Sequence, residues 1–217
     1  MSTNPQLSVV VPVFNEQDNV APLVHEITAA LRGVAGLEFE IVYVDDCSKD
    51  GTLAELRALK AARGQWIATL DGDGQNDPAD LPRLLAHRDS AGPDVKLFAG
   101  WRVDRKDTGS KRWASKWANA IRSRMLHDAT PDTGCGTKLF ERAAFLDLPH
   151  FNHMHRYLPA LMQRAGWKTL SVPVNHRARS NGVSKYNNLN RALVGISDLL
   201  GVAWLIRRGR VTRTEEV

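Results

Sequence analysis

Two aspartates stand one residue apart at the end of an apolar run, in the sequence LDGDGQNDPAD of residues 70–80. Asp71 and Asp73 are followed two positions later by a carboxamide, Gln75. Asp, Gly and Asn tolerate the dihedral angles of tight turns, which accounts for part of this pattern. Hard cations such as Mg²⁺ and Mn²⁺ take oxygen ligands, usually one or two carboxylates completed by water and phosphates. The pattern therefore predicts a divalent metal site to which Asp73 and Gln75 both present oxygens from one turn, while Asp71 can bond to sugar or water.

A calcium-binding EF-hand is the nearest rival, because these three residues would occupy the first, third and fifth positions of its loop. The sixth position is Asn76, where glycine is required, and the twelfth is Pro82, where a bidentate glutamate is required. The EF-hand interpretation therefore fails.

A zinc site is not expected either. His150, His153 and His155 stand close together, but no cysteine lies near them and their segment has the pattern of a packed turn and helix. The two cysteines, Cys47 and Cys135, have no zinc-site spacing and make no disulfide framework. A reducing, cytoplasmic setting is therefore expected, and the N-terminal apolar run has no basic segment before it that would indicate a signal peptide.

Short β-branched runs alternate with helical patterns along the chain. Strands are predicted at residues 7–13, 39–44, 66–70 and 95–99. Helices are predicted with apolar positions from Val20 to Leu31 and an end near Gly33, at residues 52–62, and from Pro78 onward. This alternation predicts an α/β fold with an open, mostly parallel sheet and helices on both faces. Ligands bind such sheets outside the carboxyl ends of the strands, and polar residues follow all four predicted strands. A dinucleotide fingerprint and a Walker lysine loop are both absent.

The two halves of the chain differ in charge, although the net charge is +5. Residues 1–95 carry seven Lys and Arg against fifteen Asp and Glu, whereas residues 96–217 carry 22 against nine. An acidic half suits a cation, and a basic half suits phosphates or an anionic surface. A nucleic-acid partner is not expected, because the carboxylate-rich rim would repel a phosphate backbone.

Six stretches of sequence, taken in order, resemble those of a known family. They are VVVPVFNE, VDDCSKDGT, LDGDGQNDPADLP, GWR, DTGCGTKLF and RSNGVSK, which extend over residues 9–185. Together they resemble glycosyltransferase family 2, and within it the polyprenyl-phosphate glycosyltransferases related to dolichol-phosphate mannose synthase. The resemblance implies a Rossmann-like GT-A fold, a UDP- or GDP-sugar donor and a polyprenyl phosphate acceptor. It also implies Mg²⁺ or Mn²⁺ at the D-x-D turn, with Asp71, Asp73 and Gln75 as the metal ligands.

The resemblance also implies roles for individual residues. The donor pocket would include Pro12, Phe14, Asn15, Glu16, Asp45, Asp46 and Asp71. The catalytic set would be Asp73, Arg102, Arg179 and Lys185, with Arg102 matching a G-S-R motif in which Trp101 replaces the serine. Each assignment has a simpler alternative, since Asn15 and Asp46 are also residue types that cap the helices predicted after them.

The nature of the acceptor decides whether a general base is needed. An alcohol acceptor needs one, and Asp132 is the one obvious carboxylate for that role. A lipid phosphate has a second pKa of about 6 and is mostly ionised at neutral pH, so it needs none. A metal-dependent, inverting transfer to polyprenyl phosphate is the favoured interpretation. A saccharide acceptor, or a degenerate relative that only binds nucleotide sugars, remains the alternative.

Two segments suggest contact with an anionic membrane surface. Residues 111–125 form an amphipathic pattern with Trp113 and Trp117 on the apolar side, although an ordinary helix packed on the sheet fits equally well. Residues 192–206 are apolar but shorter than the ~20 residues that span a bilayer. We therefore expect a transferase domain over residues 1–190, an amphipathic tail over residues 191–217, and peripheral attachment at the cytoplasmic face of the membrane.

One part of the expected fold is missing from the sequence near residue 60. In the resembled family a further strand and helix precede the strand that leads into the D-x-D turn. Here residues 59–64 read LKAARG and leave no room for them. The sequence therefore predicts a GT-A sheet that lacks one βα unit, with no strand between Lys60 and Trp66.

Overall fold

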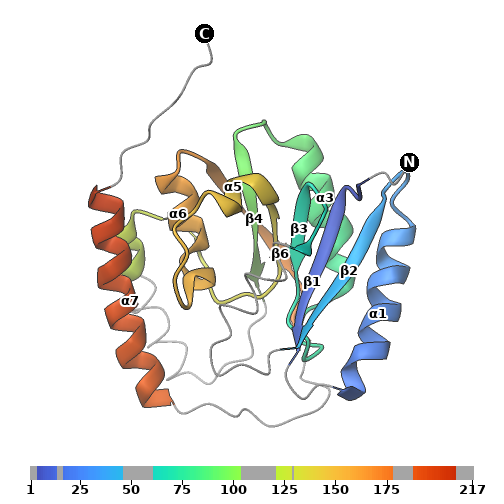
Figure 1. Cartoon of the computed structure of the whole chain (residues 1–217), viewed down its shortest axis with the longest axis horizontal. Helices are drawn as coiled ribbons and strands as arrows, with labels where there is room; N and C mark the ends of the chain where they lie inside the picture. Colours follow the sequence, from blue (N-terminus) through green and yellow to red (C-terminus); the bar gives the residue numbers. More distant parts are fainter. Residues whose placement is uncertain are drawn as a thin grey trace.

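The structure, a computed structural model, describes residues 4–13, 17–45, 61–103, 121–128, 130–177 and 188–208. In chain order the elements are β1 (Leu7–Val13), α1 (Gln17–Arg32), β2 (Phe39–Asp45), β3 (Trp66–Thr69), η1 (Pro78–Asp80), α3 (Leu81–Ser90), β4 (Val95–Arg102), β5 (Lys138–Glu141), α5 (Arg142–Leu146), η2 (Met154–Arg156), α6 (Leu158–Arg164), β6 (Lys168–Val174) and α7 (Asn188–Arg208). Residues 121–126 are also helical. Figure 1 shows these elements coloured along the chain.

Six strands of the described residues form one sheet in the order β2-β1-β3-β5-β4-β6. Strand β1 runs parallel to its two neighbours, β2 and β3, and β4 runs parallel to β6. Among the described strands, only β5 runs antiparallel to its neighbours, β3 and β4. The carboxyl ends of the other five strands therefore meet at one rim of the sheet. This rim lies at the lower edge of the molecule in Figure 1, and it is where ligands bind in sheets of this kind.

Helices cover both faces of the sheet, as predicted (Figure 1). On one face α1 and α3 pack on alternate residues of β1, and α1 contributes Leu23, Ile27 and Leu31, which recur every four residues and are all buried. On the other face α5, α6 and α7 pack on the intervening residues, such as Val10 and Ile67. Strand β1 therefore buries both of its faces along most of its length, which explains its continuous apolar sequence.

Strand β1 pairs directly with both β2 and β3, with Leu7 opposite Phe39 on one side and Trp66 on the other. Among the described strands, β2 therefore forms one edge of the sheet and β6 forms the other. Residues 61–65, which join Lys60 to Trp66, contain no strand. The prediction that no strand lies there is confirmed, whereas most of the helix predicted over residues 52–62 lies outside the described residues.

Strands β2 and β3 end within one residue of the predicted boundaries, and two other elements differ more. Strand β4 continues to Arg102 rather than ending at Ala99, because Gly100, Trp101 and Arg102 stay paired with β6. The helix predicted from Pro78 starts as a 3₁₀ turn, in which the Asp77 carboxylate accepts a hydrogen bond from the Ala79 N–H, and becomes α-helical at Leu81.

Candidate active site

The turn after β3 is held in shape by its own side chains. The Asp71 N–H donates to Asn76 Oδ1 at 2.6 Å, and the Gln75 N–H donates to Asp73 Oδ1 at 3.1 Å. Gly74 adopts a φ of 74°, a left-handed conformation that glycine reaches without strain. These bonds fix the backbone that carries Asp71 and Asp73 at the rim of the sheet, where Asp71 is exposed and Asp73 is half-buried.

Two glycines let this turn approach its neighbours closely. A Cβ on Gly72 would lie 2.7 Å from the Pro12 carbonyl oxygen at the end of β1. A Cβ on Gly136 would lie 2.2 Å from Asp71 Oδ2. The Thr69 hydroxyl also donates to the Gly136 carbonyl at 2.7 Å. The DTGCGTKLF segment, which runs into β5, is thus placed against the turn of residues 71–77, which we call the metal turn after its predicted ligands. Gly136 leaves the space that the Asp71 carboxylate occupies.

Arg102, at the end of β4, is bound by Asp132 from the same DTGCGTKLF segment. Its Nε donates to Asp132 Oδ2 at 2.7 Å and its Nη2 donates to Oδ1 at 2.9 Å, with only 14% and 10% of the two side chains exposed. The hydrogen bonds to Asp132 raise the pKa of Arg102, and the nearby Cys135 and Asp71 raise it further. This two-point contact fixes the guanidinium plane beside the metal turn.

Arg177, at the other side of the metal turn, was not singled out in the sequence. Its N–H donates to the Gln75 carbonyl at 3.0 Å. Its guanidinium donates to Glu26 of α1 and to Asp77 of the turn, each at 2.5 Å. Arg177 precedes by two residues the predicted phosphate-binding Arg179. Its position just before the RSNGVSK motif was the one feature of the sequence that could have indicated a role in the site.

The segment before Arg177 is also tied to the metal turn. His176 forms an isolated β-bridge with Asn76, and the Asn175 N–H donates to the Asp80 carboxylate at 2.7 Å. Burial raises the pKa of Asp80, which is 1% exposed. The chain that leads into RSNGVSK is therefore anchored to the turn that carries Asp71 and Asp73.

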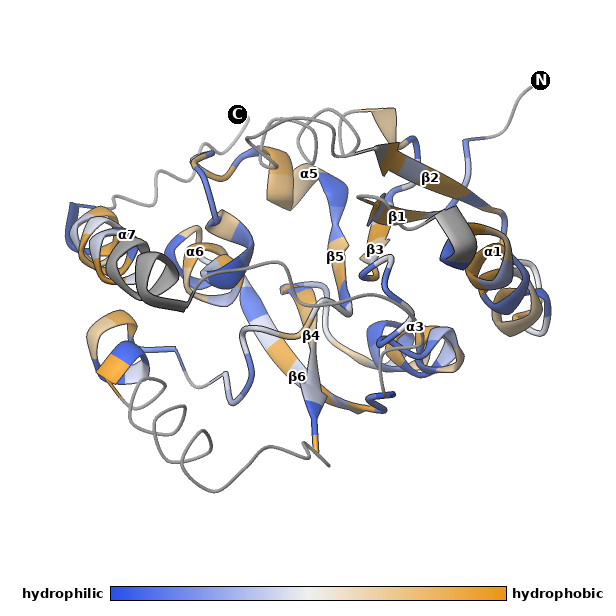
Figure 2. Ribbon diagram, turned by 90° about the horizontal axis from the view of Figure 1, so that it is seen from below, coloured by the Kyte–Doolittle hydropathy of each residue, from blue (hydrophilic) through white to orange (hydrophobic). Residues whose placement is uncertain are grey.

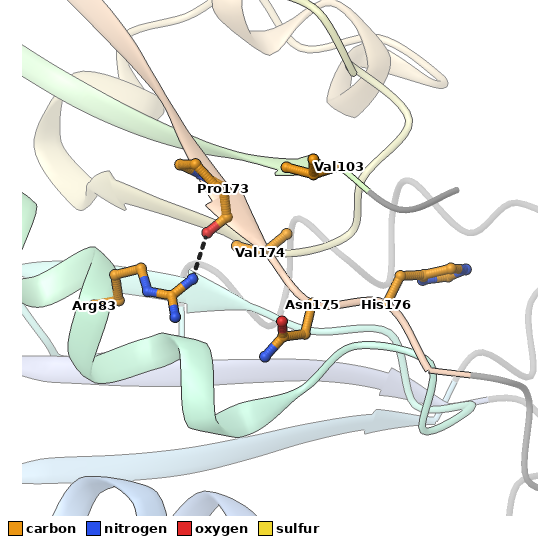
Figure 3. Close-up of a pocket in the computed structure, with 6 residues that line it drawn as sticks. All are labelled: Arg83, Val103, Pro173, Val174, Asn175 and His176. Atoms are coloured by element: carbon orange, nitrogen blue, oxygen red, sulfur yellow. Dashed lines mark hydrogen bonds between the residues drawn. The ribbon is translucent and has the colours of Figure 1, made fainter. Parts of the chain in front are cut away.

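A hollow opens beside these contacts, at the ends of β4 and β6. It is lined by Arg83, Val103, Pro173, Val174, Asn175 and His176 (Figure 3). The Arg83 guanidinium donates to the Pro173 carbonyl at 2.9 Å and forms part of one wall. At about 190 Å³ the hollow is smaller than the ~300–1,000 Å³ of typical ligand pockets, so it can hold only part of a ligand.

The other predicted site residues divide into two groups. Pro12 is half-buried at the end of β1, and Asp45 is the last residue of β2, opposite Val13. Six lie outside the described residues: Phe14, Asn15, Glu16, Asp46, Arg179 and Lys185. The described part of the site thus joins the metal turn, the Arg102–Asp132 pair and the Arg177 contacts on one rim.

The described residues contain no group of three or more His, Cys, Asp or Glu side chains that could hold a metal ion. His153, one of the three histidines noted above, instead lies 3.3 Å from Asp198 of α7. The metal turn itself offers hard carboxylate oxygens at an accessible rim. That donor set fits Mg²⁺ or Mn²⁺, which commonly bind through one or two carboxylates and complete their shells with water and substrate phosphates.

Comparison with known proteins gives one family. The profile of glycosyl transferase family 2 matches residues 8–60 and 56–148, and the two matched segments meet near residue 60. A break in the match at this point is what the absence of a βα unit would produce.

Curated relatives are similar over most of the chain. This chain is 33% identical to the dodecaprenyl-phosphate galacturonate synthase of Rhizobium johnstonii, over 93% of this chain and 68% of the relative. It is 31% identical to the undecaprenyl-phosphate 4-deoxy-4-formamido-L-arabinose transferase of Edwardsiella ictaluri, over 83% of this chain and 62% of the relative. The first alignment runs over 238 residues, more than the 217 of this chain, so that relative contains residues with no counterpart here.

Solved structures share the fold. Glucosyl-3-phosphoglycerate synthase from Mycobacterium tuberculosis, in complex with Mn²⁺, UDP-glucose and phosphoglyceric acid, superimposes with a TM-score of 0.68 at 19% identity. The match covers 92% of this chain and 80% of the synthase. The same enzyme in complex with Mn²⁺ and UDP-glucose gives a TM-score of 0.65 at 18% identity, over 94% of this chain and 79% of the synthase.

Proposed function

The chain belongs to glycosyl transferase family 2 and is a glycosyltransferase, and from this we propose that it transfers a sugar from a nucleotide-sugar donor to a polyprenyl phosphate. Both curated relatives are named for polyprenyl-phosphate products or substrates. The reaction would be metal-dependent and would invert the anomeric centre. Either UDP or GDP would serve as the nucleotide of the donor.

The donor would bind at the rim between β1, β2 and the metal turn. Pro12, Asp45 and Asp71 are the described residues of the predicted donor pocket, and Phe14, Asn15, Glu16 and Asp46 would complete it. Asp71, Asp73 and Gln75 would hold Mg²⁺ or Mn²⁺, which when bound offsets the charge of the donor diphosphate. A structural neighbour crystallised with Mn²⁺ and UDP-glucose has the same fold, which supports this arrangement.

The observation that carries the choice of acceptor is the pairing of Asp132 with Arg102. Asp132 was the candidate base for a saccharide acceptor, yet both of its carboxylate oxygens accept hydrogen bonds from the Arg102 guanidinium. A carboxylate held in this way is poorly placed to take a proton from a sugar hydroxyl. A phosphate acceptor needs no base, and this favours polyprenyl phosphate over a saccharide.

The chemistry then depends on positioning and on charge. An oxygen of the acceptor phosphate attacks the anomeric carbon, the bond from that carbon to the diphosphate breaks, and the nucleoside diphosphate leaves. Arg102, oriented by Asp132, would stabilise the negative charge that builds up on the leaving group. Arg179 and Lys185 would bind the acceptor and donor phosphates, since a guanidinium can contact two phosphate oxygens at once.

A polyprenyl phosphate acceptor lies in a membrane, so the enzyme must contact the membrane surface to use it. None of the helices among the described residues has the length and apolar character needed to cross a bilayer. We propose peripheral attachment at the cytoplasmic face, where nucleotide sugars are available.

The direct test is a transfer assay with the full chain. A panel of UDP- and GDP-sugars is incubated with a short-chain polyprenyl phosphate in detergent, with Mn²⁺, Mg²⁺ or EDTA, and products are identified by mass spectrometry. We expect a glycosylated polyprenyl phosphate that forms only with metal and has the inverted anomeric configuration by NMR. Transfer to a free saccharide instead would establish the alternative acceptor. Donor binding without any transfer would identify a degenerate relative.

A further inference from the structure

The outward face of helix α7 carries no charged side chain between residues 195 and 206. Ile196, Leu200 and Trp204 project from it, with 58%, 58% and 60% of their surfaces exposed. Because they are spaced by four residues, they lie in one stripe along the helix. The other exposed residues in this interval are Ser197 and Gly201. A surface helix in water normally has polar or charged residues on its outer side.

The inward side of α7 is already packed against the protein. Val202 and Ala203 are buried in the core, the Tyr157 hydroxyl donates to the Gly195 carbonyl at 3.0 Å, and Arg164 Nε donates to the Leu205 carbonyl at 3.0 Å. Since these contacts fix the rotation of the helix, the apolar stripe is not an unfinished core contact.

Cations end the apolar stripe. Arg207 and Arg208, in the last turn of α7, are both exposed. The acidic residue of the helix, Asp198, lies only 19% exposed next to His153 and does not join the outward stripe. We refer to Ile196, Leu200, Trp204, Arg207 and Arg208 together as the α7 face. Its charge is therefore entirely positive.

The helix of residues 121–126 lies beside α7 in both views of the molecule (Figures 1 and 2) and repeats the same composition. Ile121 is 51% exposed and Arg124 is exposed next to it. The other arginine of this helix, Arg122, is buried and paired with Asp128 at 2.7 Å. In the described part of these two helices, every exposed charged side chain is thus an arginine. The large exposed side chains beside the arginines are apolar.

We propose that the α7 face binds an anionic lipid surface, with helix α7 lying in the plane of the headgroups. The apolar stripe would enter the boundary between headgroups and acyl chains, where tryptophan is favoured, and the arginines would contact lipid phosphates. A second copy of this chain is a poorer occupant, because the face has no carboxylate to pair with the arginines of a partner. The inference stands on α7 itself, and only its use in catalysis rests on the proposed polyprenyl phosphate acceptor.

Vesicle co-sedimentation of the full chain tests this proposal. Phosphatidylcholine vesicles with and without phosphatidylglycerol are used, in the absence of donor and acceptor. We expect binding to the anionic vesicles only, weakened by salt. The double variant Leu200→Glu/Trp204→Glu should lower the partition coefficient about tenfold or more. The double variant Arg207→Gln/Arg208→Gln should lower it about 25-fold, at roughly fivefold for each arginine.

Leu170→Glu is the matched control, because Leu170 is also an exposed leucine, at 42%, but stands on β6 away from α7. This variant should bind as the unaltered chain does. Equal binding by the α7 variants would overturn the proposal. A second result would also overturn it: the unaltered chain does not bind vesicles but forms a dimer by light scattering, and the α7 variants are monomeric.

Transfer to polyprenyl phosphate in detergent separates this proposal from the proposed function. The α7 variants should retain that activity, since none of the changed residues lies in the site. Transfer in detergent without vesicle binding would overturn the α7 proposal alone. Vesicle binding without transfer would count against the proposed function alone.

Discussion

Arg177 and Asp77 form a 2.5 Å ion pair that joins two segments of the site 100 residues apart in the sequence. The same guanidinium reaches Glu26 of helix α1, which follows the first predicted donor-binding motif. One side chain therefore connects three parts of the rim: α1, the metal turn and the entry to RSNGVSK. We interpret Arg177 as a positioning residue that holds these parts in register.

Replacing Arg177 tests this interpretation. We expect Arg177→Ala to lower kcat about 10- to 100-fold, as loss of a supporting contact around a metal site does. Stability should fall by no more than about 1 kcal/mol, because the side chain is 42% exposed. The matched control is Arg63→Ala, which removes a similar exposed pair with Glu40 away from the rim. Equal effects of the two variants on kcat would mean that Arg177 has no special role.

Asp73 is predicted to bind the metal. Asp73→Asn keeps the shape of the side chain but removes its charge, so metal-dependent turnover should fall by more than about 100-fold. The melting temperature should change little, because the turn lies at the surface. Asp89→Asn, at an exposed aspartate of α3, should leave turnover unchanged. Metal-dependent transfer at the normal rate by the Asp73 variant would remove it from the metal site.

Gly136 is predicted to be irreplaceable because of its contact with Asp71. A methyl group at this position would meet Asp71 Oδ2 at 2.2 Å, so the carboxylate or the backbone must move. We expect Gly136→Ala to raise the metal concentration needed for half-maximal activity. Gly33→Ala is the control, since nothing lies within 4 Å of a Cβ there. The comparison is a metal titration of initial rates, and matching titration curves for the two variants would contradict the prediction.

The Arg102–Asp132 pair distinguishes the two acceptor hypotheses. Asp132→Asn leaves Arg102 without this carboxylate partner, and we expect the free energy of unfolding to fall by about 3 kcal/mol. If Asp132 only orients Arg102, the variant should keep a measurable rate and an unchanged pH profile. If Asp132 were a general base, the acidic limb of the pH–rate profile, where the rate falls as the base becomes protonated, would instead depend on it. Urea denaturation and pH–rate profiles of the variant measure the two effects.

The missing βα unit should affect the donor. Strand β2 is one edge of the described sheet, so we expect one wall of the proposed nucleotide pocket to be more open than in a complete GT-A domain. We expect UDP or GDP to bind weakly, with a Kd near or above about 1 mM, the upper end of common KM values. Isothermal titration calorimetry with Mn²⁺ present gives this value. Micromolar binding would show that the missing wall does not limit the site.

Local sequence determined the elements of this protein. Runs such as LSVVVPV can bury both faces only inside a covered parallel sheet, and the four-residue spacing of Leu23, Ile27 and Leu31 suits only a helix. The D-x-D pattern predicted a metal site from local sequence alone, because a few residues of one turn would supply its protein ligands. The shortened segment near residue 60 was also visible, since a strand and a helix need a minimum number of residues.

Tertiary structure decided which distant residues meet. Nothing in the sequence pairs Asp132 with Arg102, or Arg177 with Glu26 and Asp77, because these contacts depend on the order of strands in the sheet and not on spacing along the chain. The exposure of Ile196, Leu200 and Trp204 was likewise hidden, since an apolar helix reads the same whichever of its sides is buried. Packing against α6 fixes the rotation of α7, and that rotation sets which residues face outward. Local propensities are short-range, whereas strand order and helix rotation follow from the free energy of the whole core.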